Sequence, residues 1–183
     1  MNIAIFLDRD GVIIENQPNY VRSWAEVKFI PGAISALARL KNGPYKIVII
    51  TNQAGIGRGV LSHSAVEEIN ERLQQVILSE DGRVDGIYVC PHKPEDGCSC
   101  RKPQPGLIHQ AAHHLNLDLE RSILIGDNIS DLQAGQAAGV GQVVLVRTGL
   151  GIESEQKLQA AGLTGVPIFA DLPQALANLV NIP

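Results

Sequence analysis

Residues 3–11 read IAIFLDRDG, an apolar run that ends in two carboxylates, Asp8 and Asp10, and a glycine. An unbroken apolar run is typical of a strand covered on both faces of a parallel sheet. Two acids this close repel each other and cost stability unless something uses their charge. Mg²⁺ uses such carboxylates together with substrate phosphates, and a carboxylate can also act as a nucleophile. The stretch therefore predicts a buried strand with a chemically active carboxyl end.

Length and composition indicate a globular protein. The chain has 183 residues, 45% of them apolar, so we expect a single domain over residues 1–183 with a sizeable core. A formal net charge of −4 argues against nucleic acid as the main partner. The apolar runs are too short to span a bilayer, and the N-terminus lacks the pattern of a secretory signal. We therefore expect a cytoplasmic monomer without a nucleic-acid or membrane partner.

Strand patterns and helix patterns alternate along the chain. The predicted strands are Ile3–Leu7, Lys46–Ile50, Gly86–Val89, Ser122–Ile125, Val143–Val146 and Pro167–Ala170. The predicted helices are Gly32–Lys41, Ser64–Ser79 (with a capping box of Ser64 and Glu67), Pro105–Leu115, Asp131–Ala138, Ser154–Ala161 and Leu172–Val180. This alternation predicts an α/β protein with a doubly wound, mainly parallel sheet.

Polar residues follow several of the predicted strands. In a doubly wound sheet, ligands bind outside the carboxyl ends of the strands, so these residues should meet in one crevice. Besides Asp8 and Asp10, they are Thr51, Asn52, Gln53, Asp127 and Asn128, with Arg101 and Lys102 at the end of the loop after the third strand. Acids, cations, an amide pair and a hydroxyl are the groups that phosphoryl transfer requires.

Four of these motifs resemble those of the haloacid dehalogenase (HAD) superfamily of phosphohydrolases: Asp8–Gly11, Thr51–Gln53, Lys102, and Gly126-Asp127 with Asp131. A finer similarity, to the D-glycero-D-manno-heptose 1,7-bisphosphate 7-phosphatase family, lies in residues 51–59 (TNQAGIGRG), 90–92 (CPH), 98–106 (CSCRKPQPG) and 146–149 (VRTG). The resemblance implies a Mg²⁺-dependent hydrolase that removes the C7 phosphate of a heptose bisphosphate in nucleotide-activated heptose biosynthesis.

The resemblance also implies roles for single residues. Asp8 would attack phosphorus and form an aspartyl-phosphate, and Asp10 would give a proton to the leaving sugar oxygen and later take one from water. Asp8, Asp127 and the backbone carbonyl of Asp10 would hold Mg²⁺, which offsets the repulsion between two anions. Thr51 and Lys102 would bind the transferring phosphoryl oxygens.

Asp131 and Asn128 are open to more than one interpretation. Asp131 is either a helix N-terminal acid stabilised by the helix dipole or a residue that orients Lys102 or a metal-bound water. Asn128 stands where many members of the family have Lys, so one cation near the substrate is missing.

The three cysteines lie within eleven residues and form a pattern with one histidine. Three thiolates and one imidazole are a closed tetrahedral set for structural Zn²⁺, with the ligands Cys90, His92, Cys98 and Cys100. The alternative is three unlinked thiols and a surface histidine. Since the loop leads directly into Arg101 and Lys102, zinc would set the direction of both cations.

Substrate selection is assigned to loops. Helices and strands already occupy most of the 43 positions from Asp8 to Thr51 and the 51 from Thr51 to Lys102, so we expect a capless, Rossmann-like HAD fold with a small zinc-binding loop. The predicted substrate-binding residues are Asn16, Asn19, Tyr20, Asn52, Gln53, Arg58 and Arg101. Arg101 would bind a second phosphate or a sugar hydroxyl, or else is a surface arginine.

Two other functions remain open at this point. Histidinol-phosphate phosphatases share the nucleophile motif and a similar zinc loop, but Lys102–Gly106 and Val146–Gly149 look like the heptose family. A phospho-receiver or an interaction module without turnover is a different class. Asp10 argues against it, because a second acid at this place promotes hydrolysis.

Overall fold

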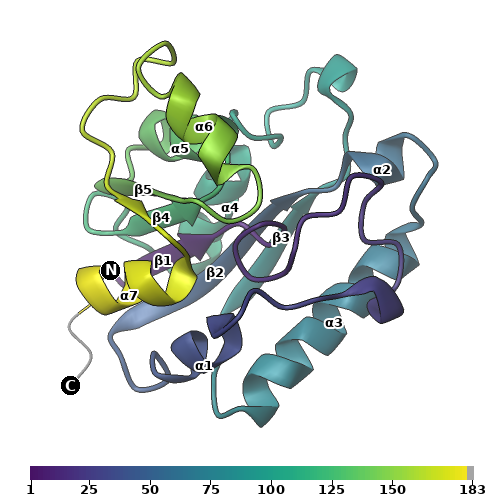
Figure 1. Ribbon diagram of the computed structural model, residues 1–183, viewed down its shortest axis with the longest axis horizontal. Helices are drawn as coiled ribbons and strands as arrows, with labels where there is room; N and C mark the ends of the chain where they lie inside the picture. The colour runs from purple at the N-terminus through teal and green to yellow at the C-terminus, as the bar shows by residue number, and fades with distance from the viewer. Residues whose placement is uncertain (181–183) are drawn as a thin grey trace.

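The computed structural model describes residues 1–180 (Figure 1). Its strands are β1 (Ile3–Leu7), β2 (Tyr45–Asn52), β3 (Gly86–Cys90), β4 (Ile123–Gly126), β5 (Gln142–Val146) and β6 (Ile168–Phe169). They form one sheet in the order β3-β2-β1-β4-β5-β6, and every neighbouring pair is parallel. The order reverses on either side of β1, so the prediction of a doubly wound parallel sheet is confirmed.

The helices follow the predicted alternation. They are α1 (Ala33–Ala38), α2 (Ala54–Gly57), α3 (His63–Ser79), α4 (Gly106–Leu115), α5 (Ile129–Ala138), α6 (Gly151–Lys157) and α7 (Leu172–Leu179), with 3₁₀ turns η1 (Trp24–Glu26) and η2 (Pro94–Asp96). The short helix α2 was not predicted, because four residues rich in glycine carry no helical period.

The predicted capping box of α3 is wrong. The N-cap is Ser62, which has extended backbone angles and whose side chain accepts a hydrogen bond from the Ala65 amide at 3.1 Å. Ser64 therefore lies inside the first turn, where its hydroxyl instead pairs with that of Ser62. Two serines two positions apart give the same local signal, and the backbone conformation decides which one caps.

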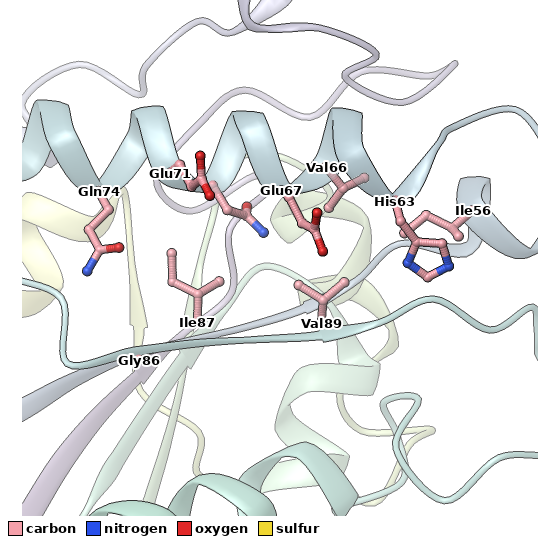
Figure 2. A pocket seen from close by; sticks show the side chains of 10 residues that line it. Ile56, His63, Val66, Glu67, Glu71, Gln74, Gly86, Ile87 and Val89 are labelled. Carbon is pink, nitrogen blue, oxygen red and sulfur yellow. The ribbon is translucent and has the colours of Figure 1, made fainter.

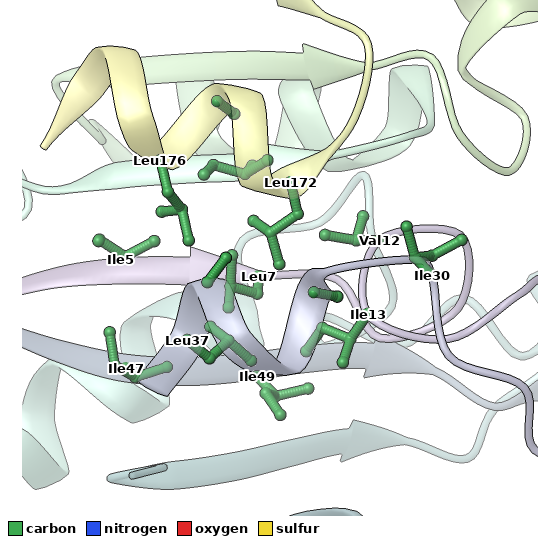
Figure 3. Packing of buried hydrophobic residues seen from close by; sticks show 14 of the residues in the cluster. Ile5, Leu7, Val12, Ile13, Ile30, Leu37, Ile47, Ile49, Leu172 and Leu176 are labelled. Carbon is green, nitrogen blue, oxygen red and sulfur yellow. The ribbon is translucent and has the colours of Figure 1, made fainter. Parts of the chain in front are cut away.

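Two hydrophobic clusters cover the two faces of the sheet. Along β1, Ile5 and Leu7 belong to one cluster, and Ala4 and Phe6 belong to the other, as the alternation of a strand requires. Helices α1 and α7 (Figure 3), together with α3, supply the first cluster, whereas α4 and α5 supply the second. Burial on both faces explains why the strands are continuously apolar.

The register of the sheet sets the position of the first acid pair. Leu7, the last residue of β1, is aligned with Ile49 of β2 and Ile125 of β4. Asp8 therefore emerges at the carboxyl edge between two neighbouring strands. In residues 1–180 the chain between β1 and β2 forms only η1 and α1, and the chain between β2 and β3 only α2 and α3, which agrees with a capless fold.

No helix in residues 1–180 combines the length and the apolar character needed to cross a membrane. A single domain over residues 1–183 stays a prediction.

Candidate active site

A cavity of about 180 Å³ lies at the carboxyl ends of the strands. The predicted chemical residues Asp8, Asp10, Thr51, Lys102 and Asp127 all line it. They come from four segments that are far apart in the sequence. The other residues that line the cavity are Asn16, Asn52, Arg101, Asn128, Ser130, Asp131 and Leu150. The structure thus brings the four motifs to one place.

Lys102 stands between two carboxylates. Its Nζ lies 2.9 Å from Asp8 Oδ1 and 2.7 Å from Asp131 Oδ1, and it donates a third hydrogen bond to the Ile50 carbonyl at 2.9 Å. Burial lowers the pKa of Lys102, but the charges of Asp131 and Asp8 outweigh burial and raise it. Lys102 is therefore a fixed cation at the wall of the cavity.

Asp131 fulfils both functions that the sequence left open. Its Oδ2 accepts a hydrogen bond from the backbone N–H of Asn128 at 3.0 Å, so Asp131 closes a capping box at the start of α5. Its Oδ1 at the same time pairs with Lys102. Asn128 is the N-cap, and its side chain accepts from the Ser130 amide at 3.0 Å.

The carboxylates of the cavity carry more negative charge than the protein neutralises there. Burial, followed by the charges of Asp131 and Asp10, raises the pKa of Asp8 to about 7 against the opposing effect of Lys102. Burial and the charges of Asp131 and Asp8 raise the pKa of Asp127 well above its ordinary value. One lysine thus faces three crowded acids.

These acids fit a magnesium ion. Asp8, Asp127 and Asp131 can each place one carboxylate oxygen within 4.8 Å of the others. A set of oxygen donors with uncompensated negative charge is what a hard divalent cation prefers. Asp131, whose relation to a metal the sequence left open, is the third member of this group.

Two glycines allow the loop after β5 to close on Asp127. A Cβ atom at either Gly11 or Gly149 would lie 2.0 Å from Asp127 Oδ2, and both residues have positive φ angles, of 89° and 59°. The Leu150 amide donates to Asp127 Oδ2 at 2.8 Å, and the Thr148 hydroxyl donates to the Gly11 carbonyl at 2.6 Å. The sequence gives no sign that these glycines contact an acid 22 or more positions away.

Gln53 lies behind the cavity. Its side chain is buried, does not line the cavity, and donates from Nε2 to Asp10 Oδ2 and Thr51 Oγ1, each at 2.9 Å. We predicted that Gln53 binds a sugar hydroxyl, whereas the structure commits its amide to Asp10 and Thr51. Since a glutamine has the same chemistry in either place, only the direction of the side chain separates the two interpretations.

Three of the predicted substrate-binding residues line the cavity: Asn16, Asn52 and Arg101. Asn52 and Lys102 exchange two hydrogen bonds of 3.1 Å between the Asn52 amide group and the Lys102 backbone. Arg101 Nη1 donates to the His92 carbonyl at 3.2 Å. Asn52 therefore positions Lys102 as well as bordering the space beside it.

The other predicted substrate-binding residues lie outside this lining. Arg58 Nη1 donates to the Tyr20 hydroxyl at 3.0 Å, and this pair links α2 to the loop after β1. Asn19 is exposed one residue before Tyr20. A substrate larger than the cavity would be needed to reach these three residues.

Arg9 is a site residue that sequence reasoning missed. Its side chain is fully buried, although it lies between the two acids of the first motif. It pairs with Asp10 and donates to Asn70 of α3. An arginine beside two carboxylates is an available signal, but nothing local indicates that it points into the protein.

Cys90, His92, Cys98 and Cys100 gather at the end of β3. The three sulfurs lie 3.2, 3.4 and 3.6 Å from one another, and His92 Nδ1 lies 3.3 and 3.6 Å from two of them. Zn–S bonds of about 2.3 Å place two sulfurs of a tetrahedron roughly 3.8 Å apart, so the cluster is close to the size that zinc needs. The donor set fits a structural zinc ion.

A second hollow, of about 440 Å³, lies between α3 and β3 (Figure 2). It has an apolar floor that includes Ile87 and Val89, and Glu67 and Glu71 border it. Two carboxylates without a lysine or arginine among the lining residues are unsuited to an anionic substrate. The smaller cavity at the strand ends is therefore the candidate active site.

A parallel doubly wound sheet with this arrangement of acids and a lysine defines a HAD-like phosphohydrolase. A family model for HAD-hydrolase-like proteins matches residues 99–175. The D-glycero-beta-D-manno-heptose-1,7-bisphosphate 7-phosphatase of Escherichia coli (strain K12) is 40% identical over 180 residues, which cover 94% of this chain and 93% of that protein. The protein of that name from Pseudomonas aeruginosa is 38% identical, with 97% of each chain covered.

A solved structure gives the same result. The D,D-heptose 1,7-bisphosphate phosphatase of B. bronchiseptica, complexed with magnesium and phosphate, superposes with a TM-score of 0.89 at 36% identity and covers 98% of each chain. This chain belongs to the D-glycero-D-manno-heptose 1,7-bisphosphate 7-phosphatase family. It is a phosphoric monoester hydrolase, and the resemblance inferred from its motifs is confirmed.

Proposed function

We propose that this chain removes the C7 phosphate of D-glycero-β-D-manno-heptose 1,7-bisphosphate and releases inorganic phosphate and the heptose 1-phosphate. The observation that carries this proposal is the convergence of Asp8, Lys102, Asp127 and Asp131 on one small cavity. The relatives named for this activity match nearly the whole chain, and their names specify the beta anomer. A cavity of about 180 Å³ suits a terminal phosphate rather than a whole sugar.

The first chemical step uses Asp8 as nucleophile. A carboxylate oxygen of Asp8 attacks phosphorus, and the bond between phosphorus and the C7 oxygen breaks as the aspartyl-phosphate forms. Asp10 gives its proton to the departing oxygen, which leaves as a neutral alcohol. Lys102 and Thr51 line the same cavity and bind the oxygens of the transferring group.

The second step reverses the role of Asp10. Its carboxylate, now ionised, takes a proton from a water molecule that attacks phosphorus. The bond between phosphorus and Asp8 breaks, which restores the Asp8 carboxylate and releases phosphate. Asp10 ends the cycle protonated, as it began.

Asp8, Asp127 and the backbone carbonyl of Asp10 would hold Mg²⁺, with Asp131 close by. When bound, the ion lowers the repulsion between the anionic nucleophile and the anionic phosphate. Lys102, whose Nζ lies 2.9 Å from Asp8 Oδ1, gives a second, permanent positive charge beside the nucleophile. A Zn²⁺ ion on Cys90 and its partners would act mechanically, because four protein ligands leave no open position.

The sugar and its second phosphate would lie over the mouth of the cavity. Asn16 and Arg101 border it, and Arg101 offers a planar fork for a phosphate or for hydroxyl groups. A phosphorylated sugar is the partner that this proposal requires. A monomeric state and a cytoplasmic location stay predictions from the sequence.

Phosphate release from a panel of substrates tests the proposal. The panel contains heptose 1,7-bisphosphate in both anomers, fructose 1,6-bisphosphate and histidinol phosphate, each with Mg²⁺. We expect the β-anomer of the heptose bisphosphate to have the highest kcat/KM, with phosphate lost only from C7. Preference for histidinol phosphate would overturn the substrate assignment.

Asp8→Asn tests the nucleophile on the best substrate of that panel. We expect turnover to fall by about 10³-fold or more, since the amide cannot attack phosphorus. The matched control is Asp81→Asn, because Asp81 is an exposed acid on the surface loop after α3. Substantial residual turnover by a folded Asp8→Asn protein would refute the assignment of Asp8.

A further inference from the structure

Arg9 is the largest of the fully buried side chains, and its charge has one carboxylate partner among the described residues. Its Nη2 lies 2.9 Å from Asp10 Oδ2, its Nε donates to the same oxygen at 3.1 Å, and Nη2 donates to Asp10 Oδ1 at 3.2 Å. The planar guanidinium therefore faces both oxygens of the Asp10 carboxylate. A fork-to-fork arrangement fixes the plane of a carboxylate as well as its position.

The far end of Arg9 is anchored to another element. Its Nη1 donates to Asn70 Oδ1 of α3 at 2.9 Å, across 61 positions of sequence. Both residues of this contact are nearly inaccessible, with Arg9 0% and Asn70 8% exposed. Helix α3 thus holds the guanidinium from behind, and the guanidinium holds Asp10.

Gln53 and Thr51 also contact the Asp10 carboxylate. Gln53 Nε2 donates to Asp10 Oδ2 at 2.9 Å, and the Thr51 hydroxyl lies 3.4 Å from the same oxygen. Oδ2 is therefore surrounded by donors, whereas Oδ1 has Arg9 as its hydrogen-bond partner. The Asp10 side chain is 20% exposed and lines the cavity.

We propose that Arg9, braced by Asn70, is the positioning residue that aims the Asp10 carboxylate at the reacting phosphate through both chemical steps. This inference rests on the proposed function, in which Asp10 exchanges the proton. Proton transfer needs the donor oxygen within hydrogen-bond reach of the oxygen that receives it, so a small rotation of Asp10 slows the step. Arg9 acts only through Asp10, since it does not line the cavity.

Stability alone does not explain why an arginine is buried at this position. A buried ion pair contributes little net stability, because desolvation of both charges opposes their attraction. An apolar side chain could fill the same volume. The arrangement is explained by the direction that it gives to Asp10.

The test compares two leaving groups. Arg9→Lys keeps the positive charge but loses the fork, and Asn70→Ala removes the brace. We expect Arg9→Lys to lower kcat for the heptose bisphosphate by about 10- to 100-fold with KM changed by less than about 3-fold. Asn70→Ala should act in the same direction by about 3-fold, because it borders the hollow between α3 and β3, from which water can replace the lost acceptor.

p-Nitrophenyl phosphate separates positioning from general damage. Its leaving group departs without a proton, so the first step does not need Asp10, whereas the second step still does. In the Arg9→Lys protein we expect a burst of p-nitrophenolate equal to the enzyme concentration, at the wild-type rate, followed by slow turnover. A structural defect would slow the burst itself.

Two controls make the outcome unambiguous. Arg72→Lys changes an exposed arginine on α3 and should leave the turnover of both substrates unchanged. Asp10→Asn should show the same pattern as Arg9→Lys, but stronger; if Asp10→Asn leaves turnover intact, the acid–base role itself fails.

If Asp10→Asn is impaired while Arg9→Lys and Asn70→Ala both turn over the bisphosphate at the wild-type rate, the positioning role of Arg9 is overturned. An equal loss in the burst and in steady turnover also overturns it. Should Arg9→Lys not fold, Asn70→Ala decides by the same two measurements.

Discussion

The chemistry of this protein depends on how individual charges are crowded. Lys102 is held between Asp8 and Asp131, and it remains a cation because their combined charge outweighs the cost of its burial. Burial, together with the charges of the neighbouring acids, raises the pKa of Asp8 and of Asp127, because Lys102 offsets only part of these effects. The same crowding that makes the acids weak prepares them for a divalent cation.

The raised pKa of Asp8 predicts how magnesium binding depends on pH. Between its ordinary value of 3.8 and about 7, Asp8 keeps a proton in the folded protein that the unfolded chain releases. Asp8 therefore contributes stability at low pH that is lost as the pH rises to about 7. Mg²⁺ competes with this proton, so its stabilising effect should grow over the same range.

Thermal unfolding with and without Mg²⁺, at about pH 5.5 and about pH 8, measures this effect. We expect Mg²⁺ to raise Tm more at the higher pH, and the difference to shrink in Asp8→Asn. An equal rise in Tm at both pH values in the wild-type protein would contradict the prediction.

Among the elements of the fold, the loop after β3 connects the cysteine–histidine cluster to the acids of the cavity. It begins at Cys90, whose carbonyl accepts a hydrogen bond from the backbone N–H of Gln53 at 2.7 Å. It ends at Lys102, whose backbone is hydrogen-bonded to the Asn52 side chain. Both ends therefore contact the carboxyl end of β2, at Asn52 and at Gln53 directly after it. The position of the loop decides where Arg101 and Lys102 stand.

Removal of zinc should disturb the active site without unfolding the protein. Burial raises the pKa of the Cys90 thiol to about 12, whereas hydrogen bonds, chiefly from Cys100, lower the pKa of Cys98 to about 7 despite its burial. Without a metal, the Cys90 thiol is therefore neutral, and no central cation holds the four side chains together. We expect kcat/KM to fall about 10-fold, with activity restored by added Zn²⁺.

The measurement uses a zinc-selective chelator with Mg²⁺ kept saturating, together with metal analysis and circular dichroism. The Cys98→Ser protein should show the same defect without a chelator. Full activity in a protein proven free of zinc would show that the loop keeps its place unaided.

At the scale of the whole molecule, the sheet is a platform stabilised by two clusters, one on each face. Helices α1, α3 and α7 cover one face, and α3 also carries Asn70, which reaches the site through Arg9. The packing of the fold and the geometry of the site are therefore linked through the same helix.

Two leucines of different exposure test the core. Leu37 of α1 is 0% exposed in the cluster of Figure 3, whereas Leu78 of α3 is 66% exposed. We expect Leu37→Ala to lower the free energy of unfolding by about 2–5 kcal/mol, because it removes buried contacts and leaves a cavity. Leu78→Ala should change it by less than about 0.5 kcal/mol. Urea unfolding measures both, and equal effects would contradict this assignment of the core.

Much of the fold was predictable because strand and helix signals are local. Within residues 1–180, all six strands and six of the seven α-helices were predicted to within a few residues. The helix α2 is too short for a periodic signal, and the cap of α3 depended on backbone angles at Ser62 rather than Ser64. Helix α6 begins at Gly151 instead of Ser154 because its first turn follows directly from the loop that covers Asp127.

The site was predictable in its membership but less so in its orientation. Asp8, Asp10, Thr51, Lys102 and Asp127 line one cavity, as expected from residues that follow parallel strands. The partners of amide side chains were harder to predict, because the Gln53 amide can bind a sugar hydroxyl or a neighbouring carboxylate with the same atoms.

Residue type and short-range spacing were sufficient to predict the alternation of strands and helices, the chemical groups at the strand ends and the members of the cysteine–histidine cluster. The three-dimensional fold was needed to establish that Gln53 and Arg9 turn toward Asp10, that Asn70 contacts Arg9 and that Gly149 packs against Asp127. The contacts of Gln53, Asn70 and Gly149 join segments that are far apart in the sequence, and Arg9 is turned inward by Asn70 on α3. Their relative placement follows from packing of the whole sheet and its helices, so no local pattern specifies these contacts.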